Sequence, residues 1–200
     1  MSTPIVSHPR AAALILASLG LLFASGGRAE AAEIRHTVDN ADLCRVNPVR
    51  HAPLRASKDA VIEADVHLRE AIGDEVRARA QEEAAEERFA ELQAAYAPRS
   101  DLRSARVYMS WARMEHRLTE ARLEQAEALR VLGAAELELG KLQLMEAYQI
   151  EEVERYRVSR FEDQLDSAQW DYDRATEKVE RLEKRLVEAR ASWESTLATR

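Results

Sequence analysis

The 200-residue chain is poor in the residues that cross-link or break structure. It has one cysteine, six glycines and five prolines, and no proline follows Pro98; aromatic residues make up 6%. These scarcities exclude collagen, a disulfide-rich miniprotein and a Pro/Gly-rich disordered chain, and they disfavour most β-sandwiches. Charged residues, by contrast, reach 32%, whereas about 25% is ordinary. The composition therefore favours helices rich in Ala, Glu, Leu and Arg, as in coiled coils.

The chain also lacks an apolar run long enough to cross a membrane. Its longest run, residues 11–24, has 14 residues, whereas a transmembrane helix needs about 20. Arg10 precedes this run, and small residues follow it, with Ala29 and Ala31 in an A-x-A pattern. The pattern predicts a signal peptide over residues 1–31, cleaved after Ala31 or Ala29. We therefore expect a periplasmic or secreted protein with no integral membrane span after cleavage.

Positive charge is in deficit. Removing Arg10, Arg28 and Glu30 from the full-chain totals of 29 basic and 36 acidic residues leaves 27 basic and 35 acidic. Nucleic-acid binding depends on clustered Lys and Arg, so this acidic, mixed-sign chain argues against a nucleic-acid partner.

Residues 32–52 have no sustained period and are predicted to be a flexible lead. They contain Cys44, the only cysteine. In an oxidising compartment a single cysteine predicts either an inert thiol or an intermolecular disulfide between two copies.

Motifs that carry chemistry are missing. The sequence has no H-E-x-x-H, no C-x-x-C-H, no G-x-S-x-G and no phosphate-cradling glycine loop. Glu63 and His67 lie one helical turn apart, which is more often an ordinary surface pair than a metal site. We predict no catalytic, cofactor-binding or metal-binding residues, no cofactor and no enzyme activity.

Residues 53–97 carry a heptad pattern that predicts one long helix. One row has alanine every seven residues, and the row three residues earlier is interrupted by Glu75 and Glu82. The alanine row holds Ala64, Ala71, Ala78 and Ala85. Pro98 ends the pattern, because proline disfavours helical geometry in the residue before it.

Residues 100–200 contain no proline and are predicted to form a second long helix that packs antiparallel to the first. Two heptad frames follow one another, offset by five positions and connected by a row at eleven-residue spacing, which is compatible with a continuous helix. Gly133 and Gly140 leave open a break within residues 133–141. The predicted fold class is all-α: an elongated antiparallel helical hairpin or coiled coil with a long C-terminal helix, or alternatively a three-helix bundle with a turn near Gly140.

The second frame is the strongest signal in the chain. Its large side chains are the predicted coiled-coil seam: Phe161, Leu165, Tyr172, Val179, Leu182, Leu186 and Trp193. The first helix is too short to cover this seam, so we expect a second copy, another envelope protein or a fold-back near Gly140 to cover it. Trp170 lies off the seam and is a candidate exposed contact.

These features together predict an exported coiled-coil interaction protein: an envelope scaffold, spacer or assembly factor. The heptad character of residues 54–200 resembles the tentacle helices of periplasmic holdase chaperones, although the β-strand body of that family is missing here and the chain is acidic. That resemblance implies a holdase for unfolded export clients as an alternative. An accessory helical component of an efflux or secretion system is the other alternative.

Overall fold

The computed structural model describes residues 33–198, so the predicted signal peptide lies outside the described residues. The described part is all-α, as predicted. Its elements are α1 (Asn40–Leu43), the 3-10 helix η1 (Pro48–His51), α2 (Leu54–Ala94), α3 (Arg99–Ala147), the 3-10 helix η2 (Glu151–Arg155) and α4 (Val158–Ala198). None of the helices within residues 33–198 is both long and apolar enough to span a bilayer.

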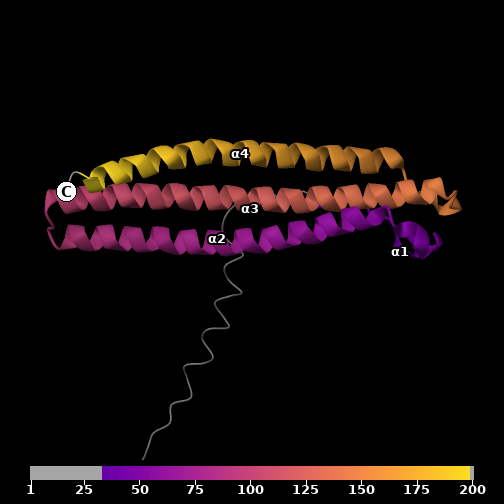
Figure 1. Cartoon of the computed structure of the whole chain (residues 1–200), viewed down its shortest axis with the longest axis horizontal. Coiled ribbons are helices and arrows are strands. Elements are labelled where there is room, and N and C mark those ends of the chain that lie inside the picture. The colour runs from indigo at the N-terminus through magenta and orange to yellow at the C-terminus, as the bar shows by residue number, and fades with distance from the viewer. Residues whose placement is uncertain (1–32, 199–200) are drawn as a thin grey trace, which may run out of the picture. The chain divides into compact units, whose positions relative to one another are not determined.

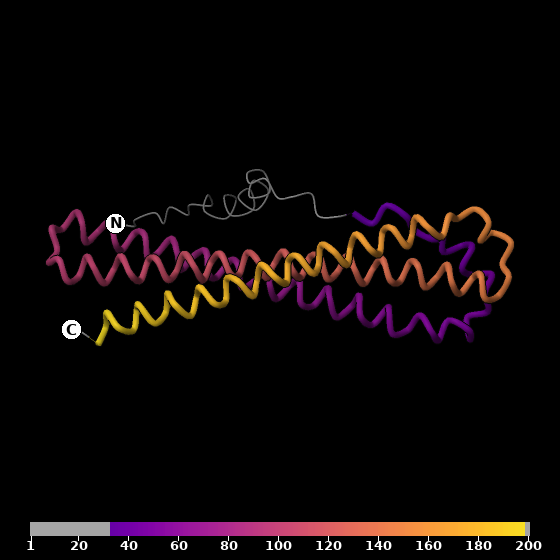
Figure 2. Tube along the Cα trace, turned by 90° about the horizontal axis from the view of Figure 1, so that it is seen from above, coloured from indigo at the N-terminus to yellow at the C-terminus, as the bar shows by residue number. Residues whose placement is uncertain are grey.

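The three long helices form a layer with α3 in the middle. Both α2 and α4 pack along α3, and they lie on opposite sides of it (Figure 1). Seen from above, α4 runs obliquely over the α2–α3 hairpin (Figure 2). The expected single helix over residues 100–200 is thus corrected to two helices, and the three-helix alternative describes the topology better.

The break between α3 and α4 falls at neither glycine. It follows a Schellman motif, in which Gln149 adopts a left-handed φ of 52°. The Gln149 N–H donates to the carbonyl of Glu146, and the Ile150 N–H donates to the carbonyl of Met145 over 3.0 Å. Ile150 also packs against the core cluster that contains Met145, so burial holds the turn in place although its left-handed residue is not glycine.

Gly133 and Gly140 lie inside α3 and face α2. A Cβ added at Gly133 would lie 3.5 Å from Val61, and one at Gly140 would lie 3.3 Å from Leu54. The two glycines therefore allow close approach of the two helices, and they do not end a helix.

Replacing Gln149 with glycine is expected to raise the free energy of unfolding by about 0.5–1 kcal/mol. The left-handed conformation costs an L-residue about 1–2 kcal/mol, and the greater freedom of glycine in the unfolded chain offsets part of the gain. Urea denaturation followed by circular dichroism measures the change. Tyr96→Gly is the matched variant, because Tyr96 also has φ 52° in the α2–α3 turn and is 94% exposed; a loss of stability in both variants would contradict this account.

The segment before α2 is ordered, which corrects the expected flexible lead. Residues 33–46 form what we call the N-terminal clasp. Val38, Leu43 and Val46 are buried in one cluster with Leu142 of α3 and Phe161 of α4. The clasp lies at the η2 end of the bundle, away from the α2–α3 turn (Figure 2). Ile34, His36 and Val38 are half-buried or buried and alternate with exposed residues, but three positions that include a histidine are too few to make a recognisable strand-like pattern.

Candidate functional site

The predicted seam of α4 faces α3 of the same chain. Phe161 is buried in the clasp cluster, and Leu165 and Tyr172 pack beside Leu132 and Ala135. Val179, Leu182 and Leu186 pack on Leu118 and Ala121. The ring of Trp193 lies 5.2 Å from that of Tyr108. All seven residues therefore lie on the face of α4 that packs against α3. This seam is covered within the chain, so it gives no reason to expect a partner.

The two other predicted contact residues are on the surface. Trp170 is 61% exposed, and the guanidinium of Arg174 lies 5.3 Å from its ring centroid. Cys44 is exposed and carries a free thiol. Their accessibility fits the predicted roles, while the contact at Trp170 and the intermolecular disulfide at Cys44 stay predictions.

The two halves of the bundle are held together differently. The α3–α4 half contains clusters of large apolar side chains, whereas the residues of α2 that are fully buried are Leu54, Ala64, Ala78 and Ala85. Alanine buries little apolar area, and hydrophobic stabilisation follows area. Polar groups therefore carry a larger share of the contact between α2 and α3.

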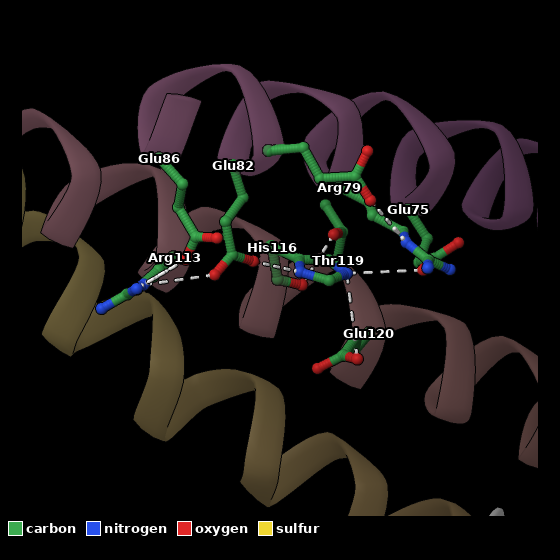
Figure 3. A network of polar contacts seen from close by, with 9 residues as sticks. Glu75, Arg79, Glu82, Glu86, Arg113, His116, Thr119 and Glu120 are labelled. Atoms are coloured by element: carbon green, nitrogen blue, oxygen red, sulfur yellow. Dashed lines mark hydrogen bonds and ion pairs between the residues drawn. The ribbon is translucent and has the colours of Figure 1, made fainter. Parts of the chain in front are cut away.

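The main polar group of this contact is His116. Together with Glu75, Glu82, Glu120 and Arg113 it forms what we call the histidine cluster. The Nδ1 of His116 lies 2.5 Å from Glu82 and its Nε2 lies 3.4 Å from Glu75, both on α2 (Figure 3). Glu120, one turn further along α3, is 3.8 Å from Nε2. The side chains of His116, Glu75 and Glu82 are only 16–22% exposed. The two glutamates that interrupt the apolar row of α2 thus have a partner on α3.

The cluster extends toward the α2–α3 turn through Arg113. This guanidinium donates to Glu86 at 2.5 Å and lies 3.4 Å from Glu82 (Figure 3). Glu82 therefore bridges Arg113 and His116. The pKa of Arg113 is raised, mainly because of the hydrogen bond with Glu86 and despite some desolvation.

The carboxylates change the titration of His116. Burial by itself lowers its pKa, but the hydrogen bonds with Glu82 and Glu75 and the charges of Glu120 and Glu82 outweigh burial, so the pKa is raised above 6.5. The imidazolium form can donate from both ring nitrogens at once, to one glutamate each. Protonated His116 therefore links α3 to α2 more strongly than neutral His116 does.

We expect the stability of the bundle to fall as the pH rises from about 6.5 through the raised pKa of His116. A raised folded-state pKa contributes stability that is complete below the unfolded value and is lost above the folded one. His116→Gln should remove this fall and cost about 1.5 kcal/mol at pH 6, because the hydrogen bonds lost involve charged groups. Chemical denaturation between pH 6 and 9 measures both effects. His67→Gln is the control, since His67 is half exposed beside Glu63 and Glu70 on α2; an equal effect there would contradict the assignment.

A second set of polar contacts fastens the clasp. The side chain of Gln164 accepts from the backbone N–H groups of Arg35 and His36, each at 2.8 Å, and donates to the carbonyl of His36. Glu138 accepts from the N–H of Val38 at 2.8 Å. The backbone of the clasp thus adds polar contacts to the packing of Val38, Leu43 and Val46. Backbone contacts do not depend on side-chain type, so they leave no pattern in the sequence of the clasp.

Away from the clasp, α2, α3 and α4 line a shallow groove of about 470 Å³. Its lining includes Ala126, Leu129, Val179, Glu70 and Glu183. Among residues 33–198 no three His, Cys, Asp or Glu side chains are arranged to hold a metal ion.

Comparisons of the chain with protein-family models, with curated proteins and with solved structures find no match.

Proposed function

We propose that the chain is an exported, non-catalytic helical interaction protein that serves the cell envelope as a spacer or scaffold. The observation that carries this proposal is the outer face of α2. Ile62, Val66 and Val76 are 62%, 46% and 58% exposed, which is a large apolar surface for a helix of a soluble bundle.

This face points away from the rest of the bundle. Ile62 and Val66 flank Ala64, and Val76 lies two residues before Ala78; both alanines are buried against α3. Two residues correspond to about 200° of helical rotation, so the aliphatic side chains lie opposite the α3 contact. Intramolecular packing thus accounts for one face of α2 and leaves the other available.

Export is tested by expressing the full chain with a C-terminal tag in a Gram-negative host and recovering it from the periplasmic fraction. We expect a processed N-terminus at residue 30 or 32. An unprocessed chain in the cytosol would contradict the proposal.

Interaction is tested in the same cells with a photo-cross-linking amino acid at position 66. We expect cross-linked products from position 66 and few from position 187, because Val187 is a similarly exposed valine on α4. Stoichiometric suppression of the aggregation of an unfolded outer-membrane protein by the purified chain would instead favour the holdase alternative.

A further inference from the structure

One continuous row of residues, spaced three or four positions apart, lines the outer face of α2. Every member is exposed except Gly73, which is half-buried. The row consists of Arg55, Lys58, Ile62, Val66, Arg69, Gly73, Val76, Ala80, Ala84, Glu87 and Glu91. The row averages 3.6 residues per step, so it keeps to one side of a straight helix, and no other part of residues 33–198 covers it.

Charge is distributed unevenly along the outer row. Its first members, Arg55 and Lys58, are basic, its last members, Glu87 and Glu91, are acidic, and most of the positions between them are apolar or small. A parallel copy would place like charges together at both ends. An antiparallel copy places the basic end of each helix beside the acidic end of the other.

Gly73 marks the middle of the row. Within the chain a Cβ at this position would meet only the mobile end of the Arg77 side chain, at 3.4 Å. Gly133 and Gly140 face α2 within the bundle, but no neighbouring helix within residues 33–198 lies against a Cβ at Gly73. Because glycine costs about 1 kcal/mol in a helix interior, the close approach of another backbone is a physical reason for it.

From these observations we propose that the outer row is a self-association surface, on which α2 of a second copy packs antiparallel with the two Gly73 residues at the two-fold axis. This register places Val66 beside Ala80 of the second copy and Ile62 beside Ala84. It also brings Lys58 near Glu87 and Arg55 near Glu91 of the second copy. Val66 and Ile62 thus each meet an alanine, Val76 lies beside Arg69 of the second copy, and each contact occurs twice by symmetry.

The inference rests on the proposed function, which it deepens by naming the partner. The apolar centre supplies most of the affinity, while the exposed charge pairs at the ends set the direction and are screened by salt. The α2 edge of the layer is outermost (Figure 1), so pairing there leaves α3 and α4 in place.

Sedimentation velocity on the purified processed chain tests the pairing. We expect a concentration-dependent dimer that persists in reductant and in Cys44→Ala, which separates it from a disulfide at Cys44. Val66→Glu should shift the dimer dissociation constant upward at least tenfold. Val187→Glu on α4 should leave it unchanged.

A charge swap tests the antiparallel direction. Lys58→Glu and Glu87→Lys should each weaken the dimer, and the double variant should restore it. The two residues are about 43 Å apart along one helix, so only a contact between copies can produce the restoration. In the Cys44→Ala background, Gly73→Cys should form a disulfide-linked dimer upon oxidation, whereas Val187→Cys should not.

A chain that stays monomeric at all concentrations, or a Val66→Glu variant that dimerises like the wild type, would overturn the inference. If the purified chain is monomeric but position 66 cross-links to another envelope protein, the proposed function stands and self-association falls. If the chain dimerises as described but is not exported, self-association stands and the proposed envelope function falls.

Discussion

Phe161→Ala is expected to lower the free energy of unfolding by about 3–5 kcal/mol, a typical cost for removing a buried aromatic side chain. Phe161 is 3% exposed and lies in the cluster that joins the clasp, α3 and α4. Its ring lies 5.9 Å from that of His36 and 6.1 Å from that of Tyr156. The substitution therefore leaves a cavity where three segments meet, and total stabilities are only about 5–15 kcal/mol.

Guanidinium denaturation measures this loss, and Val187→Ala provides the control. Val187 is on the same helix but 69% exposed, so its truncation should change stability by less than about 0.5 kcal/mol. A cost below 1 kcal/mol for Phe161→Ala would mean that the clasp and η2 do not form a packed core in solution.

The α3–α4 packing follows from the sequence because its heptad frame is regular. The residues from Phe161 to Trp193 alternate steps of three and four, and the same residues pack on α3. What the frame does not contain is the identity of the covering surface. An apolar stripe on α4 can be covered equally well by a second copy, by another protein or by an upstream helix of the same chain. Only the geometry of the turn before α4 places it against α3.

The turn between α3 and α4 could not be predicted because it lacks the glycine or proline that usually marks the end of a helix. The left-handed residue is Gln149, and no glycine or proline lies between Gly140 and the start of α4. The two heptad frames are offset by five positions because a turn separates them. The same offset is also compatible with a continuous helix that has an eleven-residue repeat, so it does not by itself indicate a turn. The glycines suggested a break, whereas they serve the packing of α2.

The sequence indicated the glutamates of the histidine cluster but not the histidine. Glu75 and Glu82 stood out as polar residues in an apolar row, but nothing local identified His116, 34 residues beyond Glu82, as their partner. A polar interruption in a seam predicts a polar partner on the opposite helix. Finding that partner requires the register of the two helices, which the Ala97–Pro98 turn sets only approximately.

The clasp depends on a buried ion pair, and Glu138→Ala is expected to destabilise the protein by about 3 kcal/mol. The Glu138 carboxylate accepts from Lys141 Nζ at 2.6 Å and from the Val38 N–H at 2.8 Å. Both side chains of the pair are 11% exposed. Removing the carboxylate strands a buried ammonium and a buried amide, and unpaired buried charges are costly.

Hydrogen exchange separates the local effect from the global one. The Val38 amide should exchange much faster in Glu138→Ala, because the clasp opens, while amides in the middle of α3 and α4 change only as far as overall stability falls. Glu138→Gln retains an acceptor for Val38 and should protect this amide partly. The double variant Glu138→Leu/Lys141→Met removes both charges and should recover most of the overall stability without recovering Val38 protection. Unchanged Val38 exchange in Glu138→Ala would show that packing of Val38 and Leu43 alone holds the clasp, and that the buried carboxylate is not its fastener.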